Sequence, residues 1–325
     1  MLTLILAELF LRWSGTSGPP IVRDDPELGR SLKPNVRYVF VNEGLSMGTI
    51  NRYGYFGPAY PRTKPDETIR VALLGDSYVA GFQLFDRHHF RSILESSLVS
   101  ATGRRVEVLN FGFAGFNLER SYVYFSKFVR QFGADYTLFF IGADDFVEKD
   151  NIFGPRCIMS HDSLIITDDF RSSRAFQKTW RLRFLRHFGL YSMHKKVLAI
   201  FQTGQTAHIL FDKFYNKKSV PEHHEEAIPE DRRKILQAIV DELVRINGTI
   251  TKVIFVIKRP IPEDIQRMIC SRGIDCLDPS DQLDDLRAIG VDPFYWQGSQ
   301  RYGHWNHKAH QVIGNFLSAE ISKKR

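Results

Sequence analysis

The chain of 325 residues carries 44 Lys and Arg against 37 Asp and Glu, so its formal net charge is +7. Hydrophobic residues make up 43% and charged residues 25%, which is ordinary for globular proteins and excludes a disordered, collagen-like or coiled-coil chain. This length predicts one large domain or two small ones. The three Cys form no CxxC pair, which excludes a disulfide scaffold and argues against a zinc site. Cys270 and Cys276 could form one bridge or stay reduced.

The N-terminal segment Leu2–Leu11 is apolar except for Thr3 and Glu8. It is shorter than the about 20 residues of a membrane span, and it lacks the positive charge that precedes the apolar run of a signal peptide. Two interpretations stay open. The segment is either the end of a membrane anchor whose first part is not in this chain, or a short helix packed on the domain.

Residues 13–66 are rich in Gly and Pro, which predicts a long irregular arm with short strands such as Val36–Val41. We therefore divide the chain into an apolar segment and arm at residues 1–66 and a domain at residues 67–322.

Within the domain, short apolar runs typical of buried parallel strands alternate with helical segments. The predicted strands are Ile69–Leu74, Val106–Phe111, Tyr136–Ile141, Lys252–Ile257 and a weaker Ile274–Leu277. The predicted helices are Arg91–Ser100, Leu118–Phe132, Arg232–Asn247, Ile261–Arg272 and a last helix after Asn306. This alternation predicts a three-layer α/β/α fold with a parallel sheet of about five strands.

The alternation breaks at about residues 151–230, where we predict a helical insertion. The segment Arg171–Lys196 contains Lys and Arg but no Asp or Glu, and its apolar residues recur at helical spacing. It is either a cap packed on the core or a contact for an anionic membrane surface or an acidic ligand. No recognition motif accompanies the charge, so we expect no nucleic-acid partner. The oligomeric state leaves no mark in the sequence.

Ligands of parallel α/β sheets bind at the carboxyl ends of the strands, so the turns there are the first candidates for a site. The first strand runs into GDSYVAG at 75–81, the second into GFAGFN at 112–117 and the third into GADD at 142–145. A fourth block, GHWN at 303–306, precedes the last helix, with Asn306 as its expected N-cap.

These four blocks, in this order, resemble the SGNH (GDSL-type) hydrolases, and the lead-in NRYGYFGPAYPRTKPDETIRVALLGDS is similar to bacterial members. The resemblance covers about residues 50–150 and 250–322. It implies a flavodoxin-like α/β/α fold and a serine esterase that acts without a cofactor on small acyl esters, often acetyl esters of a carbohydrate. The sequence does not fix the location, for which we expect a bacterial-type membrane or cell-envelope association, with the cytoplasm as the alternative.

The resemblance also implies roles for particular residues. Ser77 would be the nucleophile and His304 the base that takes its proton. The backbone N–H groups of Ser77 and Gly115 would hold the oxyanion. Asp76 would brace the turn by local hydrogen bonds.

Two positions depart from the family pattern. Asp144 stands at the oxyanion-hole position where the third block carries an Asn that donates to the oxyanion. An ionised carboxylate cannot donate, whereas Asp144 could still do so if it is protonated beside Asp145. The family's acid lies two or three residues before the histidine, where this chain has Arg301 and Tyr302. A backbone carbonyl or another carboxylate, such as Asp292, would then have to orient His304.

Alternatives therefore stay open for the function and for single residues. The rival functions are a non-catalytic binding or scaffolding protein and an O-acyltransferase that uses the same site. Ser77 could only cap a helix, and Asp144 could be a helix N-cap. We predict no metal at His304, His307 and His310, because their spacing drifts round a helix. We expect Cys157 to be an ordinary buried thiol and residues 222–226 to be a solvated loop.

Overall fold

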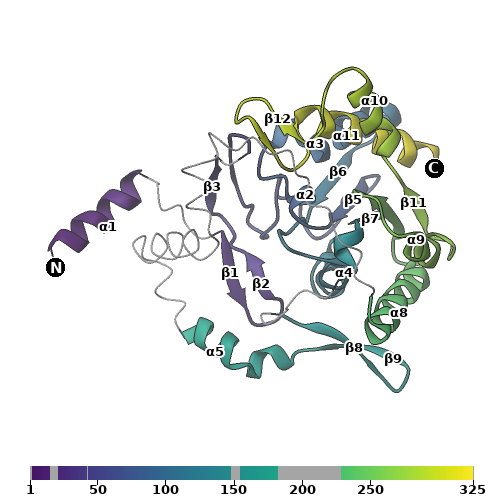
Figure 1. Cartoon of the computed structure of the whole chain (residues 1–325), viewed down its shortest axis with the longest axis horizontal. Coiled ribbons are helices and arrows are strands. Elements are labelled where there is room, and N and C mark those ends of the chain that lie inside the picture. Colours follow the sequence, from purple (N-terminus) through teal and green to yellow (C-terminus); the bar gives the residue numbers. More distant parts are fainter. Residues whose placement is uncertain (1, 15–20, 42, 148–153, 182–227, 325) are drawn as a thin grey trace.

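The computed structural model describes residues 2–14, 21–41, 43–147, 154–181 and 228–324 (Figure 1). Its centre is a parallel sheet in the order β11-β10-β7-β5-β6. The strands are β5 (Ile69–Leu74), β6 (Val106–Asn110), β7 (Tyr136–Ile141), β10 (Lys252–Ile257) and β11 (Asp275–Leu277). Every predicted strand is confirmed to within one residue at each end. The order reverses next to β5, as in a flavodoxin-like sheet, and the predicted α/β/α class is confirmed.

Helices cover both faces of the sheet. On one face, α3 (Phe90–Thr102), α10 (Ser280–Ala288) and α11 (His307–Lys323) pack on alternate strand residues such as Val71 and Leu73. On the other, α4 (Leu118–Lys127), α8 (Glu230–Ile246) and α9 (Glu263–Cys270) pack on Ala72 and Leu74. All residues of β5 are buried, which explains why the strand is apolar on both faces except at Arg70, whose guanidinium pairs with the buried Glu107 carboxylate.

One predicted helix needs correction, and one observed helix had no prediction. The helix expected over Leu118–Phe132 ends at Lys127, and a separate 3₁₀ turn, η2 (Val129–Phe132), follows it. Helix α10 was not predicted. It buries only Leu283 and Leu286, and this is too few apolar positions to produce a helical period in the sequence.

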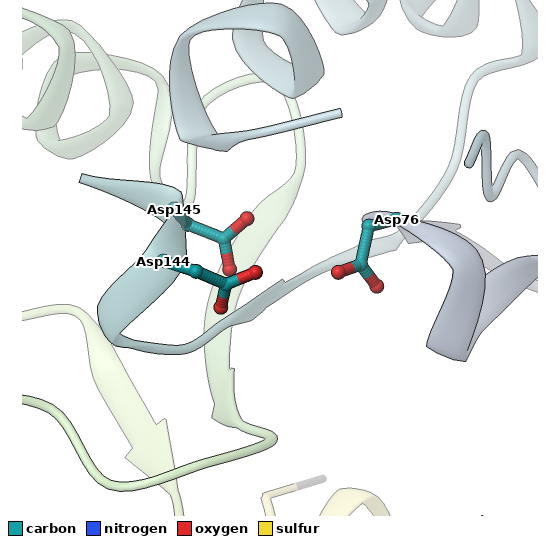
Figure 2. Close-up of side chains that lie close together, drawn as sticks. All are labelled: Asp76, Asp144 and Asp145. Atoms are coloured by element: carbon teal, nitrogen blue, oxygen red, sulfur yellow. The ribbon is translucent and has the colours of Figure 1, made fainter. Parts of the chain in front are cut away.

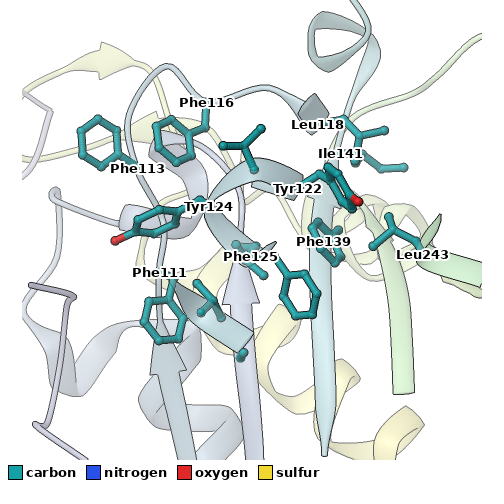
Figure 3. Close-up of a cluster of buried hydrophobic side chains, with 14 of the residues drawn as sticks. Phe111, Phe113, Phe116, Leu118, Tyr122, Tyr124, Phe125, Phe139, Ile141 and Leu243 are labelled. Atoms are coloured by element: carbon teal, nitrogen blue, oxygen red, sulfur yellow. The ribbon is translucent and has the colours of Figure 1, made fainter. Parts of the chain in front are cut away.

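The arm forms two antiparallel hairpins. They are β1 (Val22–Asp25) with β2 (Gly29–Leu32), and β3 (Arg37–Phe40) with β4 (Ser46–Thr49). Beyond them, the fully buried Tyr55 ring lies 4.8 Å from the ring of Phe111, at the end of β6. Phe111 belongs to the aromatic cluster between the sheet and α4 (Figure 3). The arm thus shares the core of the domain.

Helix α1 (Leu2–Ser14) forms at the N-terminal segment. Ile5, Leu6, Leu9 and Phe10 are each 50–59% exposed. The helix lies apart from the central sheet in Figure 1. Within the described ranges, no helix is long and apolar enough to cross a membrane.

The described start of the predicted helical insertion is a hairpin, β8 (Arg156–Ser160) and β9 (Ser163–Thr167). It is followed by the short helix α5 (Arg174–Arg181). The rest of the basic segment, from residue 182 to 196, and the loop at 222–226 lie outside the described residues. Cys157 is buried as predicted, and Cys270 and Cys276 form a disulfide that links the end of α9 to β11.

Candidate active site

Ser77 opens the short helix α2 (Ser77–Ala80), directly after the loop that follows β5. The N-cap of this helix is Asp76, whose Oδ1 accepts the backbone N–H of Tyr78 at 2.9 Å. The expected bracing role of Asp76 is confirmed. The alternative in which Ser77 serves only as the cap is wrong, because Asp76 already fills that position.

The structure brings His304 to Ser77 from the other end of the chain. His304 Nε2 lies 2.7 Å from Ser77 Oγ, which is hydrogen-bond distance. The imidazole packs against the Tyr78 ring, with the centroids 4.7 Å apart. Two residues later, Asn306 caps α11 as predicted by accepting the N–H groups of Lys308 and Ala309. The start of α11 therefore anchors the segment that presents His304.

The outer nitrogen of His304 faces a carboxylate that sequence reasoning missed. Glu43 lies between β3 and β4, and both of its oxygens are 2.9 Å from His304 Nδ1. Its Oε2 also accepts the backbone N–H of His304 at 2.9 Å. Of the alternatives expected, a carboxylate from elsewhere in the chain is the one found, but it is not the example Asp292, whose carboxylate accepts the N–H of Phe294. The acid missing next to the histidine is supplied by the arm.

Two glycines permit this approach. A Cβ on Gly303 would lie 2.3–2.7 Å from the Glu43 carboxyl group, so any side chain there would displace the acid. A Cβ on Gly44 would lie 2.3 Å from the Gln83 carbonyl oxygen and 2.5 Å from the Trp296 ring. The Trp296 indole N–H in turn donates to the carbonyl of His304 at 2.9 Å. Close backbone packing thus fixes both partners of the acid–base pair.

The electrostatics of the pair favour an ionised acid. Burial by itself would raise the pKa of Glu43, but the hydrogen bonds and charge of His304, with a further hydrogen bond from Gln83, outweigh it. The pKa of Glu43 is therefore lowered below its usual value. An ionised Glu43 accepts the Nδ1–H, which leaves Nε2 free to accept a proton from Ser77.

Beside Ser77 lies a cluster of three carboxylates around one buried ammonium group (Figure 2 shows the carboxylates). Lys258, fully buried after β10, lies 2.6 Å from Asp76 Oδ2, 2.6 Å from Asp145 Oδ2 and 3.9 Å from Asp144 Oδ1. Burial and the neighbouring carboxylates raise the pKa of Asp145 despite Lys258. The Lys258 ammonium thus ties the turns after β5 and β7 together.

The same three carboxylates lie close enough to share a cation. The Lys258 ammonium already lies within hydrogen-bond distance of two of them, so the donor set does not fit an added metal ion. The three histidines do not converge either: His304 faces Ser77, whereas the fully buried His310 accepts the N–H of Phe90 at 3.1 Å.

The remaining two predicted residues lie on turns at the same sheet edge. Gly115 occupies the exposed turn after β6, with a φ of +85° that favours glycine. Asp144, with its side chain 27% exposed, lies within the 3₁₀ turn η3 (Ala143–Asp145). The N-cap of η3 is Gly142, so the interpretation of Asp144 as a cap is wrong. Because β6 and β7 both pair with β5, the turns after them lie on either side of the turn that carries Ser77.

Sequence reasoning missed Glu43 and Lys258 for different reasons. Lys258 had a usable signal, since it follows an apolar strand at the sheet edge where ligands bind. Glu43 had none, because nothing in a hairpin turn of the arm indicates contact with a residue 261 positions later.

No family model and no curated protein matches the chain. Among solved structures, it is similar to a lipase/acylhydrolase from Enterococcus faecalis, at 15% identity and a TM-score of 0.40, covering 79% of this chain and 96% of that one. It is similar to an acetyl xylan esterase from Geobacillus stearothermophilus, at 11% identity and a TM-score of 0.41, covering 80% and 97%. A third is a protein described as lipolytic and of the G-D-S-L family from Desulfitobacterium hafniense, at 11% identity and a TM-score of 0.39, covering 77% and 98%. At these sequence identities and TM-scores, the similarities are no evidence for the activity of this chain.

Proposed function

We propose that this protein is a serine hydrolase of SGNH type that cleaves small acyl esters, with a carbohydrate ester as the expected substrate class. The observation that carries the proposal is the continuous hydrogen-bond chain from Glu43 through His304 to Ser77. Nucleophile, base and orienting acid in hydrogen-bond contact form the arrangement that activates a serine hydroxyl.

In this mechanism, Ser77 Oγ attacks the acyl carbonyl carbon while its proton passes to His304 Nε2. Glu43 accepts the Nδ1–H and stabilises the imidazolium that forms. The backbone N–H groups of Ser77 and Gly115 would hold the oxyanion. The tetrahedral intermediate expels the alcohol, which takes the proton from Nε2. Water, deprotonated by His304, then attacks the acyl-enzyme and releases the carboxylic acid.

The rival interpretation as a non-catalytic binding protein depended on two departures from the family pattern. One was the absence of an acid beside His304, and Glu43 supplies that acid. The other, Asp144 in place of an amide donor, remains and predicts a slower enzyme, since one oxyanion donor is worth about 10²–10³ in rate.

The test is hydrolysis of p-nitrophenyl acetate by the purified protein beside Ser77→Ala. We expect acetate release by the wild type and background rates in the variant. Ser96→Ala is the matched control, because Ser96 is exposed on α3 and its hydroxyl bonds only to the Ile93 carbonyl among the described residues. Equal rates in wild type and Ser77→Ala would refute the proposal.

A further inference from the structure

A groove of about 910 Å³ lies between the two hairpins that flank the acid–base pair. One wall is the turn between β3 and β4, with Val41, Glu43 and Leu45. The other is the hairpin of β12 (Tyr295–Trp296) and β13 (Arg301–Tyr302). Glu43 lines the groove, whereas Ser77 and His304 do not.

The groove connects the segments that deliver the acid and the base. Glu43 belongs to one wall, and Tyr302 of the other wall precedes His304 by two residues. Trp296 donates to the His304 carbonyl and would contact any side chain at Gly44. A molecule bound between these walls would contact both segments and hold Glu43 against His304.

The lining chemistry indicates the class of ligand. Tyr295 and Tyr302 have ring centroids 5.1 Å apart, and Tyr302 is 47% exposed. Gln297, Ser299 and Lys308 add amide, hydroxyl and ammonium groups.

Aromatic rings beside amides and hydroxyls suit a carbohydrate, whose C–H faces stack on rings while its hydroxyls form hydrogen bonds. A long acyl chain would need a continuous apolar lining, and the polar side chains of this groove interrupt it. We propose that the groove is a carbohydrate subsite, which holds sugar units next to the acylated one and whose occupation fixes Glu43 on His304. The expected effect of the groove on the reaction rate rests on the proposed esterase function, whereas the binding of a carbohydrate to the groove does not.

Binding is tested first, without catalysis. Ser77→Ala protein is applied to an array of neutral and acidic oligosaccharides, beside Ser77→Ala/Tyr302→Ala and Ser77→Ala/Tyr302→Phe. We expect at least one oligosaccharide to bind, binding to fall about tenfold with Tyr302→Ala, and binding to persist with Tyr302→Phe, which keeps the ring. If no oligosaccharide of the array binds, or if Tyr302→Ala leaves binding unchanged, the groove is not a carbohydrate subsite.

The kinetic test compares the acetylated form of the bound oligosaccharide with p-nitrophenyl acetate, which carries no sugar units to occupy the groove. We expect Tyr302→Ala to lower the ratio of the two kcat/KM values about tenfold, mainly through kcat. Val99→Ala, on the exposed side of α3, should leave the ratio unchanged. If Tyr302→Ala instead shifts preference among acyl chain lengths, the groove holds the acyl group and the inference is wrong. If the protein hydrolyses neither ester but still binds the oligosaccharide, the proposed esterase function is wrong and the carbohydrate site stands.

Discussion

Glu43 and His304 stand 261 positions apart in the chain, yet the carboxylate accepts both the Nδ1–H and the backbone N–H of the histidine at 2.9 Å. A hairpin of the arm therefore completes a site whose other members come from the central α/β domain. The double contact fixes the tautomer and the position of the imidazole together.

Substitution of Glu43 tests this relationship. We expect Glu43→Gln to lower kcat for p-nitrophenyl acetate by roughly 10²–10⁴, because the amide no longer stabilises the imidazolium and disturbs the tautomer. Steady-state kinetics would measure the change, with Glu27→Gln, an exposed residue of the arm, as the control. Unchanged kcat would show that Glu43 does not orient the base.

The same carboxylate should make stability depend on pH. The pKa of Glu43 is lowered in the folded protein, whereas an unfolded chain restores it to about 4.3. Its ionised form therefore stabilises the fold above that value, and the stabilisation is lost as the pH falls through the lower folded pKa. Urea unfolding of wild type and Glu43→Gln should give a difference in the free energy of unfolding that shrinks from pH 6 to pH 3. A difference that grows toward acid would contradict the lowered pKa.

Asp144 offers a gain-of-function test. In the family that the sequence resembles, an amide donor stands at this position, and an ionised carboxylate there opposes the oxyanion. We expect Asp144→Asn to raise kcat, by up to about 10². Asp144→Ala, which removes the charge without adding a donor, separates the two effects. A fall in kcat with Asp144→Asn would mean that the carboxyl group itself serves the reaction.

Lys258 should be important for folding as well as for the site. Its side chain is fully buried among Asp76, Asp144 and Asp145. Lys258→Met would leave buried carboxylates without a counter-charge, and we expect the free energy of unfolding to fall by about 3–5 kcal/mol. Urea denaturation measures this, with Lys323→Met as the control because that side chain is 68% exposed. A loss below about 1 kcal/mol would show that the carboxylates are already neutralised by protons.

Much of this protein was determined by its sequence alone. Apolar runs such as Tyr136–Ile141 predicted the strands, because a buried parallel strand must be apolar on both faces. The blocks around Ser77 and His304 were recognisable because tight turns and helix starts constrain the local residue types. Contact between Ser77 and His304 was implied only by the family resemblance, and the fold then brought the two side chains within 2.7 Å.

The tertiary structure decided the rest. A carboxylate can orient a histidine from any place in the chain, provided that the fold puts its oxygens at hydrogen-bond distance from the imidazole. A hairpin of the arm could therefore supply Glu43, although no spacing in the sequence indicates it. Lys258 is matched to its carboxylates by the neighbouring ends of β5, β7 and β10, and the groove exists only where two hairpins face each other. Local sequence patterns encode the elements, whereas a site built across them is set by how the elements pack.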